Sequence, residues 1–126
     1  MKDDQLYLIH MRECGDRIEQ YVSDGRETFM HSTLIQDAVL RNLQTLGQST
    51  GRLSDTLRDA HSEVNWRGIV GLRNILVHDY LGISLVRIWE IVEHDLPDLR
   101  QKVEVLIQEL EACPSDAERE KGEDGT

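Results

Sequence analysis

Apolar residues recur every three or four positions along almost the whole chain, a spacing that puts them on one face of an α-helix. The stretches that carry this pattern are residues 7–21, 35–57, 66–78, 85–92 and 99–110. The connections between them are short, so neighbouring helices are expected to run antiparallel. The sequence therefore predicts an all-α fold, a compact five-helix bundle with short loops.

Small polar residues and glycines mark the expected helix ends. The segment 23–27 is typical of a turn. Residues 60–66 are expected to connect two helices, with Asn65 as the N-cap of the second. The long stretch 35–57 is expected to kink near Gly47 or Gly51.

Gly68 and Gly71 lie inside the expected third helix, where each costs about 1 kcal/mol relative to Ala. Two interpretations are open: a loose, short helix, or a close approach by another helix, including one from a second subunit. The β-branched residues of this stretch also fit a strand. Further on, Ser84 is a candidate cap for the fourth helix. Asp95 and Pro97 are expected to separate the fourth helix from the fifth.

The charge of the chain is unevenly distributed. Its 126 residues carry 14 basic and 24 acidic side chains, a formal net charge of −10. Such acidity argues against a general nucleic-acid binder, because phosphate contacts need clustered Lys and Arg. The stretch from Val39 to His78 is the exception, with five arginines against three acidic residues. Two cysteines, far apart, exclude a disulfide framework or a zinc knuckle.

The length is enough for one domain. Residues 1–112 are expected to form the helical bundle, and residues 113–126 an acidic, disordered tail. No apolar run approaches the roughly 18 residues of a membrane span, and the N-terminal stretch lacks the apolar centre of a signal peptide. We therefore expect a cytoplasmic protein with no membrane attachment.

The segment from Arg73 to Tyr80, RNILVHDY, places polar functional side chains around an apolar triplet. On a helix with 100° per residue, Arg73 and Tyr80 are nearly aligned, whereas His78 lies about 140° around from Arg73. One straight helix therefore does not direct Arg73 and His78 at the same atom. Either the helix unwinds at His78, or a second copy supplies the complementary group across a two-fold axis.

These residue types fit RNA cleavage without a metal. His78 can accept and donate protons near neutral pH, and Arg73 can stabilise the added charge on a five-coordinate phosphorus. Attack by a 2′-OH would leave a 2′,3′-cyclic phosphate and a 5′-OH. The residue types also allow a structural role, in which His78 and Tyr80 end a helix and Arg73 pairs with an acid.

The string RNILVHDY resembles the signature of HEPN-domain proteins, in which Arg is followed by a polar residue, a short spacer and His. The tyrosine two positions after the histidine is similar to the HepT subgroup of HEPN ribonuclease toxins. The flanking strings NWRGIVGLRN and LGISLVRIWEIVEHDLPDL match that subgroup as well. The similarity covers about residues 6–110.

This resemblance implies a compact five-helix bundle that forms a homodimer, with an RNA-cleaving cleft composed of both motifs. It implies Arg73 and His78 as catalytic residues, with Asn74 supporting them. It also implies a toxin–antitoxin pair, in which a nucleotidyltransferase antitoxin of the MNT type neutralises the toxin by transferring AMP to Tyr80. The implied activity is that of a metal-independent endoribonuclease acting on RNA.

Other chemistry is weakly represented in the sequence. Glu90 and His94 are four residues apart, with Glu93 beside them, but a di-metal bundle needs two such pairs and two further Glu. We therefore expect no metal site and no organic cofactor. The alternative function is a non-catalytic helical module that binds a nucleotidyltransferase partner or a nucleotide, because one fold can host both.

Overall fold

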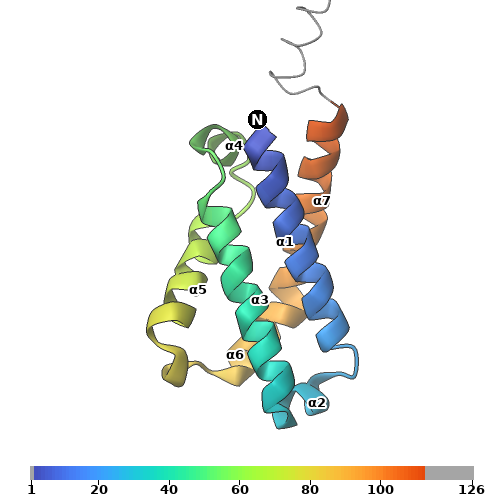
Figure 1. Ribbon diagram of the computed structural model, residues 1–126, viewed down its shortest axis with the longest axis vertical. Helices are drawn as coiled ribbons and strands as arrows, with labels where there is room; N and C mark the ends of the chain where they lie inside the picture. The colour runs from blue at the N-terminus through green and yellow to red at the C-terminus, as the bar shows by residue number, and fades with distance from the viewer. Residues whose placement is uncertain (1, 113–126) are drawn as a thin grey trace, which may run out of the picture.

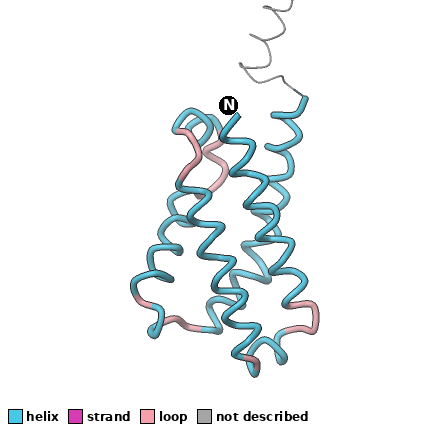
Figure 2. Tube along the Cα trace, in the orientation of Figure 1, coloured by secondary structure: helices cyan, strands magenta, loops and turns pink. Residues whose placement is uncertain are grey.

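The computed structural model describes residues 2–112, apart from the side chains of Lys2 and Tyr80. Every regular element in this part of the chain is helical (Figure 2), which confirms the all-α prediction. The elements are α1 (Lys2–Tyr21), α2 (Arg26–His31), α3 (Thr33–Gly51), α4 (Asp55–Ala60), α5 (Trp66–His78), the short 3-10 helix η1 (Tyr80–Gly82), α6 (Leu85–Glu90), the π-helical η2 (Ile91–Asp95) and α7 (Leu96–Ala112). Residues 113–126, for which the sequence predicted an acidic, disordered tail, lie outside the described residues.

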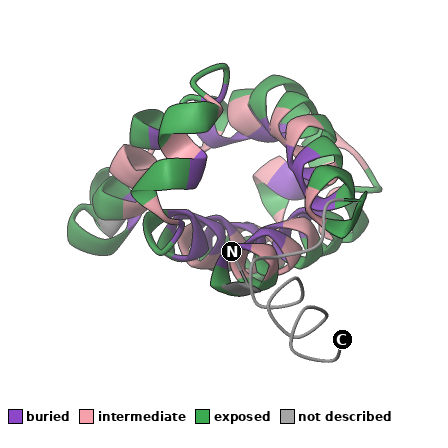
Figure 3. Ribbon diagram, turned by 90° about the horizontal axis from the view of Figure 1, so that it is seen from above, coloured by how far each residue is buried: buried purple, intermediate pink, exposed green. Residues whose placement is uncertain are grey.

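The long helices lie side by side (Figure 1). α3 packs between α1 and α5, and α1 also packs against α7. Seen from above, the buried residues face the interior of the bundle (Figure 3). The side chains that are almost completely buried include Leu8, Met11, Ile18, Phe29, Val39, Ile88, Val103 and Ile107. Apolar burial on one face of each helix is what the periodicity predicted.

Side-chain caps set several helix starts. The side-chain oxygens of Ser32, Ser54, Asn65 and Ser84 each accept a hydrogen bond from the backbone N–H three residues later. Each cap satisfies one of the N–H groups that a helix start leaves without a partner. The predicted caps Asn65 and Ser84 are therefore confirmed.

The expected single helix over 35–57 is divided. α3 ends at Gly51, and α4 begins at Asp55 after its cap Ser54. The buried carboxylate of Asp4 accepts hydrogen bonds from the Ser54 N–H at 2.8 Å and from its hydroxyl at 2.6 Å. This contact fixes the chain in a turn, where the sequence pattern predicted a kink.

Two other boundaries differ from the sequence prediction. The turn 23–27 is shorter than expected, because Gly25 adopts a φ of 95° and α2 begins at Arg26. Helix α6 does not stop at Asp95 but continues through η2 into α7, with a change of direction (Figure 1). Pro97 has no N–H to donate to the preceding turn, and the wider π-helical turn accommodates this loss.

None of the helices in the described part of the chain has the length and apolar character that crossing a membrane requires.

Candidate active site

Helix α5 crosses α3 at a glycine. A Cβ atom on Gly47 would lie 2.4 Å from Cβ of Arg73 and 3.2 Å from the carbonyl oxygen of Ile69. Real Cβ atoms do not come this close to another carbon, so only glycine fits at this crossing. Gly47 therefore allows α5 to lie against α3 with Arg73 at the contact.

Arg73 is anchored at its base and open at its tip. Its Nε is buried and has no hydrogen-bond partner among the described residues, whereas Nη1 donates to Oδ1 of Asn74 at 3.3 Å. Asn74 is exposed. The guanidinium therefore lies beside an amide at the surface, where its remaining N–H groups can reach an anion.

His78 is the last residue of α5 and is exposed. The helix is regular up to this point, and the N–H of Asp79 still donates to the carbonyl oxygen of Ile75 at 2.8 Å. Unwinding at His78 therefore does not bring it onto the side of Arg73. Within one chain, Arg73 lies on the α3 side of α5, and His78 lies on its outer face.

The turn after α5 is tight. The N–H of Gly82 donates to the carbonyl oxygen of Asp79 at 3.1 Å, and a Cβ on Gly82 would lie 2.8 Å from both carboxylate oxygens of Asp79. Tyr80 begins η1 within this turn, and its side chain lies outside the described part of the structure. The backbone thus places Tyr80 directly after the end of α5.

The two glycines inside α5 differ. At Gly68 a Cβ would lie 2.4 Å from the amide nitrogen of Asn65, the residue that caps this helix. The glycine therefore leaves room for the cap, and the approach of a helix from a second subunit at Gly68 stays a prediction. At Gly71 an added Cβ would meet no atom within 4 Å. Neither the loose helix nor the strand alternative is observed, because α5 is continuous.

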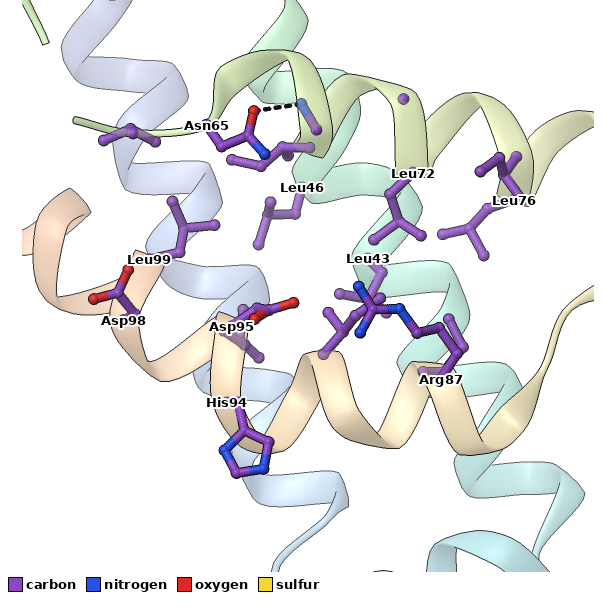
Figure 4. Close-up of a pocket in the computed structure, with 18 of the residues that line it drawn as sticks. Leu43, Leu46, Asn65, Leu72, Leu76, Arg87, His94, Asp95, Asp98 and Leu99 are labelled. Atoms are coloured by element: carbon purple, nitrogen blue, oxygen red, sulfur yellow. Dashed lines mark hydrogen bonds between the residues drawn. The ribbon is translucent and has the colours of Figure 1, made fainter. Parts of the chain in front are cut away.

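An apolar groove of about 890 Å³ lies between α5 and the run from α6 to α7 (Figure 4). Its wall on α5 includes Gly71 and Ile75, and Leu43 of α3 lines it from beneath. Arg87 and Asp95 point into the space from the opposite side. Ile75 is exposed at the groove and other apolar side chains that line it are only partly buried, so the core is incompletely covered here.

The weaker metal candidates are engaged with neighbouring side chains. Glu93 accepts a hydrogen bond from Nε1 of Trp89 at 3.2 Å and lies 3.2 Å from Nε2 of His94. Glu90 pairs with Arg87 at 3.2 Å. Over residues 2–112, no three His, Cys, Asp or Glu side chains are grouped in a way that could hold a metal ion.

An all-α bundle with Arg73, Asn74 and His78 on one helix has the architecture expected of a HEPN-type protein. Comparison with protein families agrees, because the family described as Ribonuclease HepT-like matches residues 11–106. The chain therefore belongs to the HepT-like ribonuclease family. No solved structure matches it.

Curated relatives come from archaea and bacteria. The "Probable ribonuclease HepT" of Thermococcus cleftensis is 30% identical over 79% of this chain and 92% of its own length. The "mRNA nuclease HepT" of Shewanella oneidensis is 29% identical, again over 79% of this chain and 92% of its own length. A protein of Methanocaldococcus jannaschii, whose name joins a gamma-glutamylcyclotransferase to an RNase, is 32% identical, but this chain spans only 50% of its length.

Proposed function

We propose that this protein is a metal-independent endoribonuclease that cleaves RNA by attack of a 2′-OH on the adjacent phosphate. The observation that carries the proposal is the exposed His78 at the end of α5, on the same helix as the amide-flanked guanidinium of Arg73. Family membership, over residues 11–106, supports RNA as the substrate.

The reaction needs two proton transfers and one cation. Neutral His78 takes the 2′-OH proton, and the oxygen forms a bond to phosphorus. The bond from phosphorus to the 5′ oxygen breaks, and that oxygen is protonated by an acid, a role open to a protonated histidine. Arg73 stabilises the charge on the five-coordinate phosphorus. The products are a 2′,3′-cyclic phosphate and a 5′-OH.

A homodimer resolves the divergence of Arg73 and His78, because a two-fold axis can bring Arg73 of one copy towards His78 of the other. The groove beside α5 supports such an interface. Ile75 on its α5 wall is 54% exposed, Ile83 in its lining is only partly buried, and Gly71 leaves the wall open. A second copy would cover these apolar side chains, and burial of apolar surface favours association.

We also propose that the enzyme is the toxin of a toxin–antitoxin pair and that Tyr80 is its point of control. An MNT-type nucleotidyltransferase would direct the Tyr80 oxygen to the α-phosphorus of ATP, with release of pyrophosphate and transfer of the phenolic proton to the transferase. The adduct adds a phosphodiester charge two residues after His78. That charge would compete with RNA phosphate for the cation of Arg73.

Cleavage of a labelled RNA in EDTA tests the nuclease proposal. Wild type is expected to cleave, and His78→Ala and Arg73→Ala to lose at least about 100-fold in rate, the usual size of an acid–base or electrostatic contribution. His10→Ala changes an exposed histidine of α1 and is the matched control. Cleavage that stops in EDTA and returns with a divalent ion would contradict the mechanism.

Co-expression with the proposed MNT-type nucleotidyltransferase antitoxin tests the role of Tyr80. Intact-mass analysis is expected to show added AMP on wild type and none on Tyr80→Phe, which keeps the ring and lacks the acceptor oxygen. Tyr80→Phe should also stay toxic when the antitoxin is present. Wild-type protein that is neutralised without any added mass would show inhibition by binding alone.

A further inference from the structure

Three polar side chains form a line along the outer face of α5. Asn74 and His78 follow Arg67 by seven and eleven residues, which places all three within about 40° around the helix. All three are exposed. The outer face of α5 therefore offers a polar path from Arg67 to His78.

Helix α3 continues this surface. The two helices run in opposite directions (Figure 1). They touch where Gly47 lies against the Arg73 side chain. Arg52 follows Gly47 by five residues and Arg67 precedes Arg73 by six, so these two arginines lie at the same level. By the same register, Arg41 of α3 lies at the level of His78. Arg41 of α3 and Arg52, the C-cap residue directly after that helix, are eleven residues apart, which places both exposed side chains on the same side.

The guanidinium groups of Arg41, Arg52 and Arg67 have no hydrogen bond or ion pair to the other described residues, so they keep their charge available. Gln48, also exposed, lies between the two arginines of α3 and adds no charge. Asp37, the acidic residue one turn before Arg41, takes part in an interaction within the protein and is not free. This face is therefore a cationic surface on a chain whose net charge is −10.

Two arginines elsewhere on the bundle are paired with acidic side chains. Arg100 pairs with Asp16 and Glu19, and Arg12 pairs with Glu104 at 3.4 Å. Along α3 and α5, by contrast, a polyanion would meet guanidinium groups that no acidic side chain of the described residues already pairs with.

We propose that Arg52, Arg67 and Arg41 form a track for the phosphates of a single-stranded RNA, leading it to Arg73 and His78. This inference rests on the proposed nuclease function and names residues outside the reacting centre. Arg67 and His78 are about 16 Å apart along the helix axis, a length that spans several nucleotides of one strand. A single strand fits better than a duplex, because the 2′-OH must be free to swing into line with the bond that breaks.

Comparing a short with a long RNA substrate distinguishes the contribution of the track from that of the reacting centre. The two substrates are a dinucleotide with one phosphate and a twelve-nucleotide RNA. The test variants are Arg67→Gln and Arg52→Gln. Arg17→Gln on α1 removes the same charge outside the track and is the control. For the longer RNA we expect each track variant to raise KM about three- to tenfold with little change in kcat, the effect of losing one charged contact. The dinucleotide should react as with wild type.

A second measurement does not depend on cleavage. The binding constant of a 2′-O-methyl twelve-nucleotide RNA is measured over a range of salt concentrations. The slope of the logarithm of this constant against the logarithm of the salt concentration should become shallower by about 0.7 for each track arginine removed, and should not change in Arg17→Gln. Equal losses in Arg17→Gln, or unchanged KM and slope in Arg67→Gln and Arg52→Gln, would overturn the track. So would an equal rise in KM for the dinucleotide. If wild type cleaves neither RNA but the slope changes are found, the nuclease proposal fails and the track stands.

Discussion

At the scale of single residues, the position of Arg73 depends on a side-chain atom that another residue, Gly47, lacks. Gly47 has no Cβ, and this lets the base of the Arg73 side chain lie against α3. Arg73 and His78 stand out in the sequence because they share one short motif. The role of Gly47 could not be predicted in the same way, because its partner is 26 residues away and only the folded chain brings the two together.

Gly47→Ala is expected to displace Arg73. The added Cβ would lie 2.4 Å from that of Arg73, so the helices must separate, at a cost of about 1–3 kcal/mol in the free energy of unfolding. RNA cleavage should fall, with a larger effect on kcat than on KM, because the cation acts on the transition state. Gly51→Ala on the same helix meets no atom within 4 Å and serves as the control. Full activity and stability in Gly47→Ala would contradict this account.

Cys14 makes stability depend on pH in the alkaline range. Burial raises the pKa of its thiol above the ordinary value; the charge of Arg17 opposes this shift and that of Glu13 adds to it. As the pH rises, the thiol therefore loses its proton in the unfolded chain before it does so in the folded protein. The contribution of the buried, protonated thiol to the free energy of unfolding is fully present below a pH of about 8.5, and it is lost as the pH rises through the folded-state pKa. Urea unfolding should show a decline of up to about 1.4 kcal/mol per pH unit in wild type relative to Cys14→Ala. Identical pH profiles of stability in wild type and Cys14→Ala would contradict this role of Cys14.

At the scale of helices, sequence patterns correctly predicted the features that depend on contacts between residues close together in the chain. Asn65 and Ser84 cap their helices as expected, because a cap needs only a side chain and an N–H three residues away. The pattern predicted a kink near Gly51 but not the full break before α4, because that break depends on Asp4, 50 residues distant. Pro97 predicted a new helix, but the π-helical turn before it keeps the run continuous.

The contact between Asp4 and Ser54 is expected to stabilise the end of the bundle where α1 meets α4. Asp4→Ala removes the acceptor of two hydrogen bonds and leaves the Ser54 N–H without a partner, a loss of about 1–3 kcal/mol. Ser54→Ala also removes the cap of α4. Urea unfolding of both single variants and the double variant measures the coupling. Asp3→Ala, an exposed neighbour, is the control; purely additive losses would mean that the two residues act independently.

At the scale of the whole molecule, the groove beside α5 is incompletely covered. The sequence predicted the stripe of apolar residues on α5 but not the space between α5 and the run from α6 to α7, because that spacing is set by packing across the bundle. Gly71 faces this space with no neighbour of its own. The simplest physical role for such an opening in a proposed dimer is contact with the second copy.

Gly71→Leu is therefore expected to weaken the dimer. A leucine at this position fills space that the partner would occupy, and we expect the dimer dissociation constant to rise at least about tenfold, with cleavage falling in parallel. Light scattering over a concentration series gives the constant. Gly51→Leu, at another helical glycine with open space, is the matched control. A wild type that is monomeric and fully active would contradict the dimer.

Mixing two inactive variants distinguishes a composite site from one built within a single chain. Arg73→Ala protomers keep His78, and His78→Ala protomers keep Arg73. If each site takes Arg73 from one copy and His78 from the other, a mixed dimer has one complete site and one with neither residue. Random exchange makes about half of all dimers mixed, so the activity should recover to about a quarter of the wild-type level. A site contained in one chain would recover nothing, because every protomer in the mixture lacks one of the two residues. The rate of RNA cleavage after subunit exchange therefore decides whether the 140° between Arg73 and His78 is bridged by the second copy.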